Sequence, residues 1–195
     1  MSSDSEVPVI AFSTSAPGLG TRVSIRVLAE HAGALEEGLL LLGELTERWG
    51  PDGELAALAA APTLRPVAVS PETLLLLSLS EAPGVGVGME DQLAWRTGPV
   101  QLPGLPAQQA LAADLLVEEL LDAGCLSALV GVGGAWRASG PALGHAGWAV
   151  PLQDADGGRR TVRLRDGGLV TVARASGAVS ATAPRAWQAW RAHAS

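Results

Sequence analysis

The clearest alternation of hydrophobic and polar positions in this chain runs over residues 22–28. Val23, Ile25 and Val27 alternate there with arginine and serine, which is the period of a strand with one buried face. Residues 7–12 form an earlier apolar run, and the Pro-Gly-Leu-Gly sequence at 17–20 favours a turn. The sequence therefore predicts two strands, with a turn immediately before the second.

Longer segments carry the hydrophobic period of a helix. Leucines at positions 35, 39, 42 and 45 share one face of a helix predicted over residues 31–49. A second long helix is predicted over residues 106–123, because Gly124 follows it where glycine commonly ends helices. Shorter helices are predicted over residues 54–61 and 70–81, the latter starting at a Ser-Pro-Glu cap.

The C-terminal part of the chain contains short apolar runs typical of strands. We expect strands over residues 126–132, 135–139, 148–152, 160–165 and 169–173, and one earlier over 66–69. Asp- and Gly-rich sequences at 154–158 and 166–168 predict hairpin turns. The tail, residues 184–195, is expected to form a short helix that carries Trp187 and Trp190.

These elements predict an α+β fold in a single domain over residues 1–195, a length that suits one compact domain. Residues 82–104 are rich in glycine and proline, so we expect a short irregular insert there. Residues 1–15 and 190–195 are expected to be flexible.

Composition narrows the classes of function. The formal net charge is −7, and all 13 basic residues are scattered arginines, so a nucleic-acid interface is not expected. An acidic surface also disfavours docking on anionic membranes, and no apolar run is long enough to span one. The start of the chain lacks the pattern of a secretory signal, and the only cysteine, Cys125, has no partner for a disulfide. We therefore expect a cytoplasmic protein.

The titratable residues give no pattern of a catalytic or metal site. His31, His145 and His193 lie far apart without metal-ligand spacing, so no metal site is expected. Cys125 reads as a buried structural thiol. The acids at 114, 118 and 122 share one helix face, which we interpret as solvated because like charges at this spacing repel.

The most informative motif is the glycine pair in residues 128–135, which read Ala-Leu-Val-Gly-Val-Gly-Gly-Ala. This stretch resembles the glycine signature of the FAD:protein FMN transferases, the ApbE family, which reads roughly Ala-Leu-Val-Asn-(Leu/Val)-Gly-Gly-Asp. In this chain Gly131 stands in the Asn position and Ala135 in the Asp position. The backbone frame of the motif is present and its polar groups are missing.

Four further segments resemble the same family in the same order. They are 19–21, similar to Met-Gly-Thr; 48–55, similar to Arg-Phe-x-Pro-Asp-Ser-Glu-Leu; 66–71; and 148–170. The resemblance implies a mixed or antiparallel sheet with helices, shortened at the C-terminus to about the first two thirds of the family's catalytic domain. The positions that it implies for flavin contact are Gly20, Thr21, Glu54, Gly104, Gly133 and Gly134.

The departures from the family pattern bear on activity. The family opens its long helix with Asp-Leu-Gly-Gly-Ile-Ala-Lys-Gly, and here Gln101 replaces the Asp, Ala107 the Lys and Gln108 the last Gly. The later His-Ile-Ile-Asp-Pro and Ala-Asp-Ala segments, which supply metal ligands in the family, have no match. Transfer of a flavin phosphate needs charge stabilisation, usually by a metal held by carboxylates. No catalytic residue is therefore assigned, and we expect flavin transfer to be lost.

Three hypotheses for the function follow. The first is a repurposed family member that binds a small molecule or a partner, in a specialised biosynthetic pathway for example, with at most vestigial FAD or FMN binding. The second is an active flavin transferase whose metal ligands come from elsewhere, such as the carboxylates at 90–91 and 154–156. The third is a structural partner of a full-length homologue. We also expect a homodimer, with Trp187 and Trp190 at the interface or covering the chain's own core.

Overall fold

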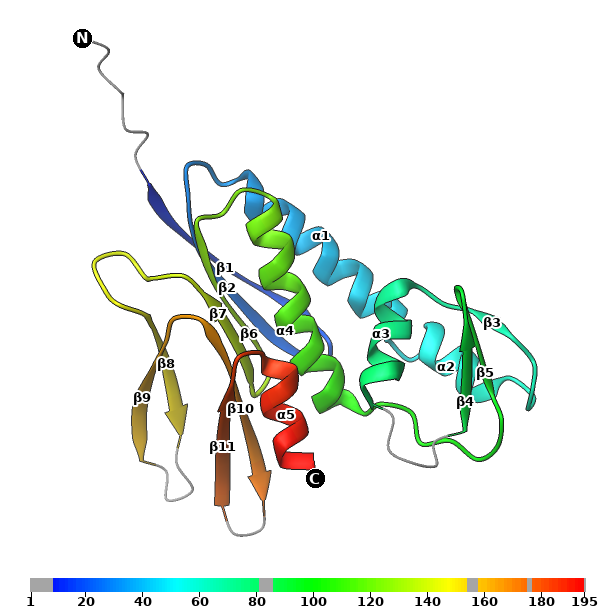
Figure 1. Cartoon of the computed structure of the whole chain (residues 1–195). Coiled ribbons are helices and arrows are strands. Elements are labelled where there is room, and N and C mark those ends of the chain that lie inside the picture. Colours follow the sequence, from blue (N-terminus) through cyan, green and yellow to red (C-terminus); the bar gives the residue numbers. More distant parts are fainter. Residues whose placement is uncertain (1–8, 81–85, 154–157, 175–176, 195) are drawn as a thin grey trace.

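A computed structural model of the chain describes residues 9–80, 86–153, 158–174 and 177–194. Its main sheet has six strands in the order β1-β2-β6-β7-β10-β11, and every neighbouring pair is antiparallel (Figure 1). The strands are β1 Ile10–Gly18, β2 Thr21–Ala29, β6 Ser127–Val132, β7 Ala135–Ser139, β10 Gly167–Arg174 and β11 Gly177–Ala183.

Three helices cover one face of this sheet: α1 Gly33–Arg48, α4 Leu105–Asp122 and α5 Ala186–Ala194 (Figure 1). A hairpin of β8 Trp148–Gln153 and β9 Arg159–Leu164 packs on the other face. Strand β6 shows the two faces, because Ala128 and Val130 pack with the helices while Leu129 packs with Trp148 of the hairpin. A strand buried on both faces has no polar alternation, which explains the continuous apolar run there.

A smaller unit lies beside the helices, at the right of Figure 1. It contains α2 Glu54–Ala60, α3 Pro71–Ser80 and a three-stranded sheet in the order β3-β5-β4, with β3 Val67–Ala68, β4 Val87–Glu90 and β5 Leu93–Arg96. Our expectation of an irregular segment over residues 82–104 was therefore wrong for β4 and β5. Met89 and Ala94 face each other in this hairpin and pack with the main core, which sustains strands despite the glycine-rich sequence.

Other differences concern the strands at the ends of the chain. The first strand extends to Gly18, so the turn consists of Leu19 and Gly20 alone. The hairpin predicted around 166–168 was wrong, because β9 pairs with β8 whereas β10 pairs with β7 and β11. Strand β11 was not predicted. Residues 10–15 and 190–194 belong to the ends that we expected to be flexible, and they lie in β1 and α5. The turn predicted at 154–158 falls mostly outside the described residues.

Candidate functional site

Segments far apart in the sequence meet at the N-terminal end of α4. The β1–β2 turn has positive φ at both residues, +48° at Leu19 and +68° at Gly20, which is the geometry of a tight two-residue hairpin. A Cβ added at Gly20 would lie 3.2 Å from Cδ2 of Leu105, the first residue of α4. The side chain of Gln109, one turn further on, donates from Nε2 to the Leu19 carbonyl oxygen at 3.1 Å. The hairpin turn is thereby held against α4.

The glycine pair between β6 and β7 reaches the same place. Gly133 has a φ of +58°, and a Cβ added there would overlap Oε1 of Gln109. A Cβ at Gly134 would overlap the carbonyl oxygen of Thr171 in β10, and the Thr171 N–H donates to the Gly134 oxygen at 2.9 Å. The positive φ explains the glycine at 133, and the close approach of β10 explains the glycine at 134.

We call this meeting point the turn junction; its members are Leu19, Gly20, Thr21, Gly104, Gln109, Gly133 and Gly134. Gly104 is the N-cap of α4, where its carbonyl oxygen accepts the N–H groups of Ala107 and Gln108 at 3.0 and 3.2 Å. Thr21 and Gly20 line an open hollow of about 450 Å³ beside the hairpin turn. No member of the junction is titratable, so it offers backbone groups, one hydroxyl and one amide to a ligand.

Two of the positions that carry charge in the family pattern are inside the core of this chain. Ala107 is 0% exposed and Ala135 is 3% exposed, and both belong to the main hydrophobic core. Gln101, at the third position, is exposed and uncharged. A metal–phosphate complex needs charged oxygen or nitrogen groups around it. The residues present at the matched positions do not fit such a group.

Glu54 does not join the turn junction through any contact among the described residues. It begins α2, and its Oε2 accepts from both the backbone N–H and the hydroxyl of Ser70 at 2.9 Å. Thr73 continues the network by accepting from Nε1 of the buried Trp49 at 2.9 Å. Glu54, one of the positions that the resemblance implies for flavin contact, therefore ties the start of α3 to α2.

Asp114 corrects our interpretation of the acidic helix face. This residue is 1% exposed, and its carboxylate accepts from the backbone N–H groups of Ala186 and Trp187 at 2.9 and 2.8 Å. Nε of Arg137 lies 3.3 Å from the same carboxylate. Burial raises the pKa of the Asp114 carboxyl above its ordinary value, although both backbone donors and Arg137 act in the opposite direction. Asp122 is exposed and Glu118 is half exposed, so only the first of the three acids departs from a solvated face.

The remaining candidates have ordinary surroundings. Cys125 is 6% exposed, and burial raises the pKa of its thiol, as expected for a structural cysteine. His31 and His145 are exposed, and the side chain of His193 is outside what the structure describes. In the described residues no three His, Cys, Asp or Glu side chains gather as metal ligands would. No helix among the described residues is long and apolar enough to cross a membrane.

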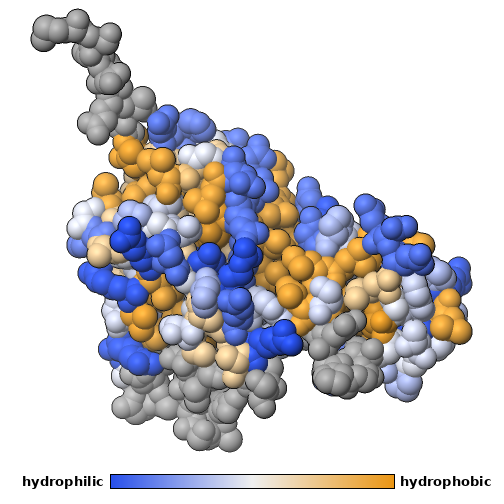
Figure 2. All heavy atoms as spheres, in the orientation of Figure 1, coloured by the Kyte–Doolittle hydropathy of each residue, from blue (hydrophilic) through white to orange (hydrophobic). Residues whose placement is uncertain are grey.

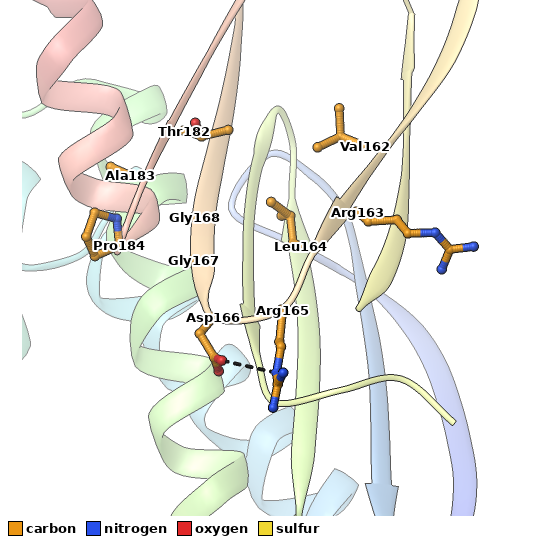
Figure 3. Close-up of a pocket in the computed structure, with 10 residues that line it drawn as sticks. All are labelled: Val162, Arg163, Leu164, Arg165, Asp166, Gly167, Gly168, Thr182, Ala183 and Pro184. Carbon is orange, nitrogen blue, oxygen red and sulfur yellow. Dashed lines mark ion pairs between the residues drawn. The ribbon is translucent and has the colours of Figure 1, made fainter. Parts of the chain in front are cut away.

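A second hollow, of about 470 Å³, lies between the β8–β9 hairpin and the β10–β11 pair (Figure 3). Its polar side chains include Arg165 and Asp166, whose closest N–O distance is 3.5 Å and which are 64% and 65% exposed. Figure 3 shows Arg163 directed away from the hollow. None of the expected site residues lines it, and its charged groups are solvated, so it makes a weaker candidate than the turn junction.

Sequence reasoning missed Gln109 of the junction and Thr171, the β10 residue that contacts Gly134. Gln109 lies within a helix between alanine and glutamine, where nothing in the pattern distinguishes it. The hydroxyl oxygen of Thr171 is buried without a hydrogen-bond partner among the described residues. Its place between apolar residues of the run 169–173 is the one sequence signal that could have indicated Thr171.

Comparison with solved structures gives a clear result for the fold. The crystal structure of the Pseudomonas stutzeri flavinyl transferase ApbE in its apo form matches with a TM-score of 0.75 and 15% identity, over 93% of this chain and 81% of that one. The chain has the fold of the ApbE flavin transferases. The Vibrio cholerae flavin transferase ApbE (TM-score 0.74, 15% identity) and the Thermotoga maritima ApbE protein (TM-score 0.71, 17% identity) match over 93% and 92% of this chain and 84% of each of theirs.

This likeness is one of architecture. No family model matches the chain, and no curated protein matches it by sequence. The expected ApbE-like α+β fold with mostly antiparallel sheets is confirmed. The alignments span 81–84% of the ApbE chains, which is more than the two thirds that the motif comparison indicated.

Proposed function

We propose that this chain is an ApbE-fold protein that has lost flavin transfer and acts by binding a small molecule or a partner. The observation that carries the proposal is the chemistry of the turn junction. Its glycines keep the tight backbone geometry, while no junction side chain is charged and the matched positions Ala107 and Ala135 are buried in the core.

The reaction of the family explains why charge matters. Transfer of FMN from FAD to a protein hydroxyl breaks the pyrophosphate, which requires neutralisation of developing negative charge and a group that accepts the hydroxyl proton. Gln109, Thr21 and the junction N–H groups can donate or accept hydrogen bonds, and none of them titrates near neutral pH. They suit recognition of a ligand better than phosphoryl chemistry.

The proposal makes a specific statement about flavin binding. A junction without charged side chains can favour a phosphate over a hydroxyl only through its backbone N–H groups, and it holds no carboxylate for a metal ion. We therefore expect FAD and FMN to bind at most about tenfold more tightly than riboflavin, and Mg²⁺ to leave the three affinities unchanged. Isothermal titration of the purified chain with each flavin, with and without Mg²⁺, measures this directly.

The matching activity assay uses FAD, Mg²⁺ and an acceptor peptide that bears a threonine or serine, with an active ApbE transferase as positive control. We expect no flavin fluorescence on the acceptor. Chelator-sensitive labelling would overturn the proposal and support a transferase with metal ligands elsewhere, Glu90 and Asp91 for example; residues 154–156 lie outside the described residues. Labelling that appears only when a full-length homologue is added would support a structural partner.

The same proposal assigns the protein to the cytoplasm. Its one cysteine, Cys125, is a buried thiol, so the fold uses no disulfide and suits a reducing compartment.

A further inference from the structure

Strand β1 forms one edge of the main sheet and lacks the usual protection of an edge. Within the part of the chain that the structure describes, its only strand neighbour is β2, with nine consecutive residue pairs from Ile10–Ala29 to Gly18–Thr21 and no bulge. Natural sheets protect their edges with charged side chains, bulges, proline or a covering segment. Residues 10–18 contain no charged residue, and their one proline, Pro17, lies next to the turn.

The hairpin turn determines which backbone groups of β1 point outward. In a hairpin with a two-residue loop, the pair that closes the loop exchanges hydrogen bonds, and the following pairs alternate. The closing pair is Gly18–Thr21, so the backbone groups of Ala11, Ser13, Ser15 and Pro17 point away from β2. Pro17 has no N–H to offer and fits this outward position. The other three residues offer N–H and C=O groups to another strand.

Apolar side chains accompany this unpaired edge. Val9 is 38% exposed and Ile10 is 46% exposed, and Phe12 is only partly buried. Leu35 and Leu39 of α1, the helix that packs on β1, are also only partly buried. Figure 2 shows hydrophobic residues gathered at the start of β1, below the N-terminal trace.

We propose that β1 pairs with β1 of a second copy of this chain, antiparallel about a two-fold axis at Ser13, so that two six-stranded sheets join. Pairing begins at Ile10 and ends at Ala16, because Pro17 cannot donate, and Ser13 is the middle of that segment. The axis then places Ala11 opposite Ser15, and Phe12 opposite Thr14. The small residues Ala11, Ser13 and Ser15 meet on one face of the joined sheet, and Phe12 meets Thr14 on the face that carries α1.

The symmetry of this edge favours a second copy as the occupant, because the outward-pointing backbone groups of Ala11, Ser13 and Ser15 are evenly spaced about Ser13 and match those of another copy. The chain has a formal net charge of −7, so two copies repel each other and associate best through an uncharged surface. Residues 10–16 form such a surface, and a two-fold contact uses the same surface on both copies. The C-terminal segment is a poorer interface than we expected from the sequence, because Trp187 is only 5% exposed and packs within its own chain.

The test compares solution masses of the full chain and two variants by light scattering after size exclusion. We expect the full chain at twice its 19.8 kDa mass. Ser13→Lys places two like charges directly opposite each other on the axis, so this variant should run as a monomer. Thr63→Lys, at an exposed loop position away from β1, adds the same charge and should remain a dimer.

A charge swap separates loss of the interface from loss of folding. Ser13→Glu should also be monomeric alone, and its carboxylate lies opposite Arg26 of β2, which favours the folded hairpin. Mixing Ser13→Lys with Ser13→Glu should restore the dimer. A monomeric full chain, a dimer that survives Ser13→Lys, a mixture that stays monomeric, or a co-purified peptide released by Ser13→Lys would each overturn the proposal.

Discussion

The turn junction and the docking site of α5 stabilise the same fold by opposite chemistry. At the junction, tight backbone geometry and the single amide of Gln109 hold two turns against the start of α4. At α5, the buried Asp114 carboxylate binds the first two N–H groups of the last helix and faces Arg137. The charged group that motif comparison would seek at the junction is absent there, while a buried charge has a structural role elsewhere. The role of a polar group in this chain is therefore better judged from its burial and its hydrogen-bond partners than from its alignment with a family motif.

The largest expected effect comes from removing the charge at α5. Asp114→Ala leaves two backbone donors and Arg137 without their acceptor in the core, so we expect a loss of about 3–5 kcal/mol in the free energy of unfolding. Glu118 lies on the same helix as Asp114 and forms a half-exposed ion pair with Arg185. Glu118→Ala removes this pair and should lower the free energy of unfolding by less than about 1 kcal/mol. Urea unfolding measures both. Equal losses would show that the two acids are equivalent and would remove the contrast.

The next effect is at the junction. Gly134→Ala places a Cβ against the Thr171 carbonyl oxygen, which belongs to a paired strand and cannot move freely, so we expect a loss of about 3 kcal/mol. Gly43→Ala is the control, because a Cβ there meets nothing within 4 Å and α1 gains helix propensity of up to about 1 kcal/mol. Thermal unfolding followed by circular dichroism distinguishes the two. An unchanged melting temperature in Gly134→Ala would contradict the close approach of the β6–β7 turn to β10.

These junction glycines show what the sequence can reveal. The motif at 128–135 indicated a backbone constraint at Gly133 and Gly134, and the structure shows a positive φ at the first and a close approach to β10 at the second. Glycine is the residue type that such positions require, so this constraint is visible in the sequence. Helix α4 was predicted within one residue, because the apolar period and Gly124, with its φ of +94°, mark it directly. Asp114 was misread, because spacing along one helix cannot show that α5 arrives on that face from 72 residues away.

The strands that were missed have a similar explanation. Strand β11 reads Gly-Ala-Val-Ser-Ala-Thr-Ala, in which small residues give almost no hydrophobic alternation, and its position is determined by pairing with β10. Strands β4 and β5 have four residues each in a glycine-rich region. The positions of β4, β5 and β11 are determined by pairing with other strands, which the hydrophobic pattern of a short segment does not show.

A smaller expected effect is the pH dependence of stability that comes from the buried Asp114. Because the folded-state pKa of Asp114 is raised, the folded protein binds this proton more tightly than the unfolded chain does. The part of the stability that depends on this proton is fully present below the unfolded pKa, and it is lost as pH rises through the folded pKa. Asp114→Asn cannot titrate, so its stability relative to the natural chain should increase with pH over that window. Urea midpoints at several acidic pH values test this, and a relative stability that falls with pH would contradict a raised pKa.

The smallest expected effect concerns the amide at the junction. Gln109→Leu removes the donor to the Leu19 carbonyl and keeps the side-chain volume, so we expect a loss of about 1 kcal/mol. Gln108→Leu is the matched control, since the Gln108 side chain donates to the nearby Pro103 carbonyl oxygen at 2.9 Å and not to the hairpin turn. Hydrogen exchange at the β1–β2 turn should accelerate in the first variant alone. Equal acceleration in both would show that Gln109 does not hold the turn.

The bond between Asp114 and α5 also constrains the order in which the chain can fold. Residue 114 leaves the ribosome 72 residues before its partner Ala186, so nascent α4 has no N–H groups of α5 to bind. Burying the carboxylate at that stage would leave it without those donors, which is costly enough to keep the face of α4 open to water. Strands β10 and β11 and then α5, which covers this face in the folded chain, are synthesised last. The carboxylate of Asp114 therefore disfavours burial of this face of α4 before α5 has been made.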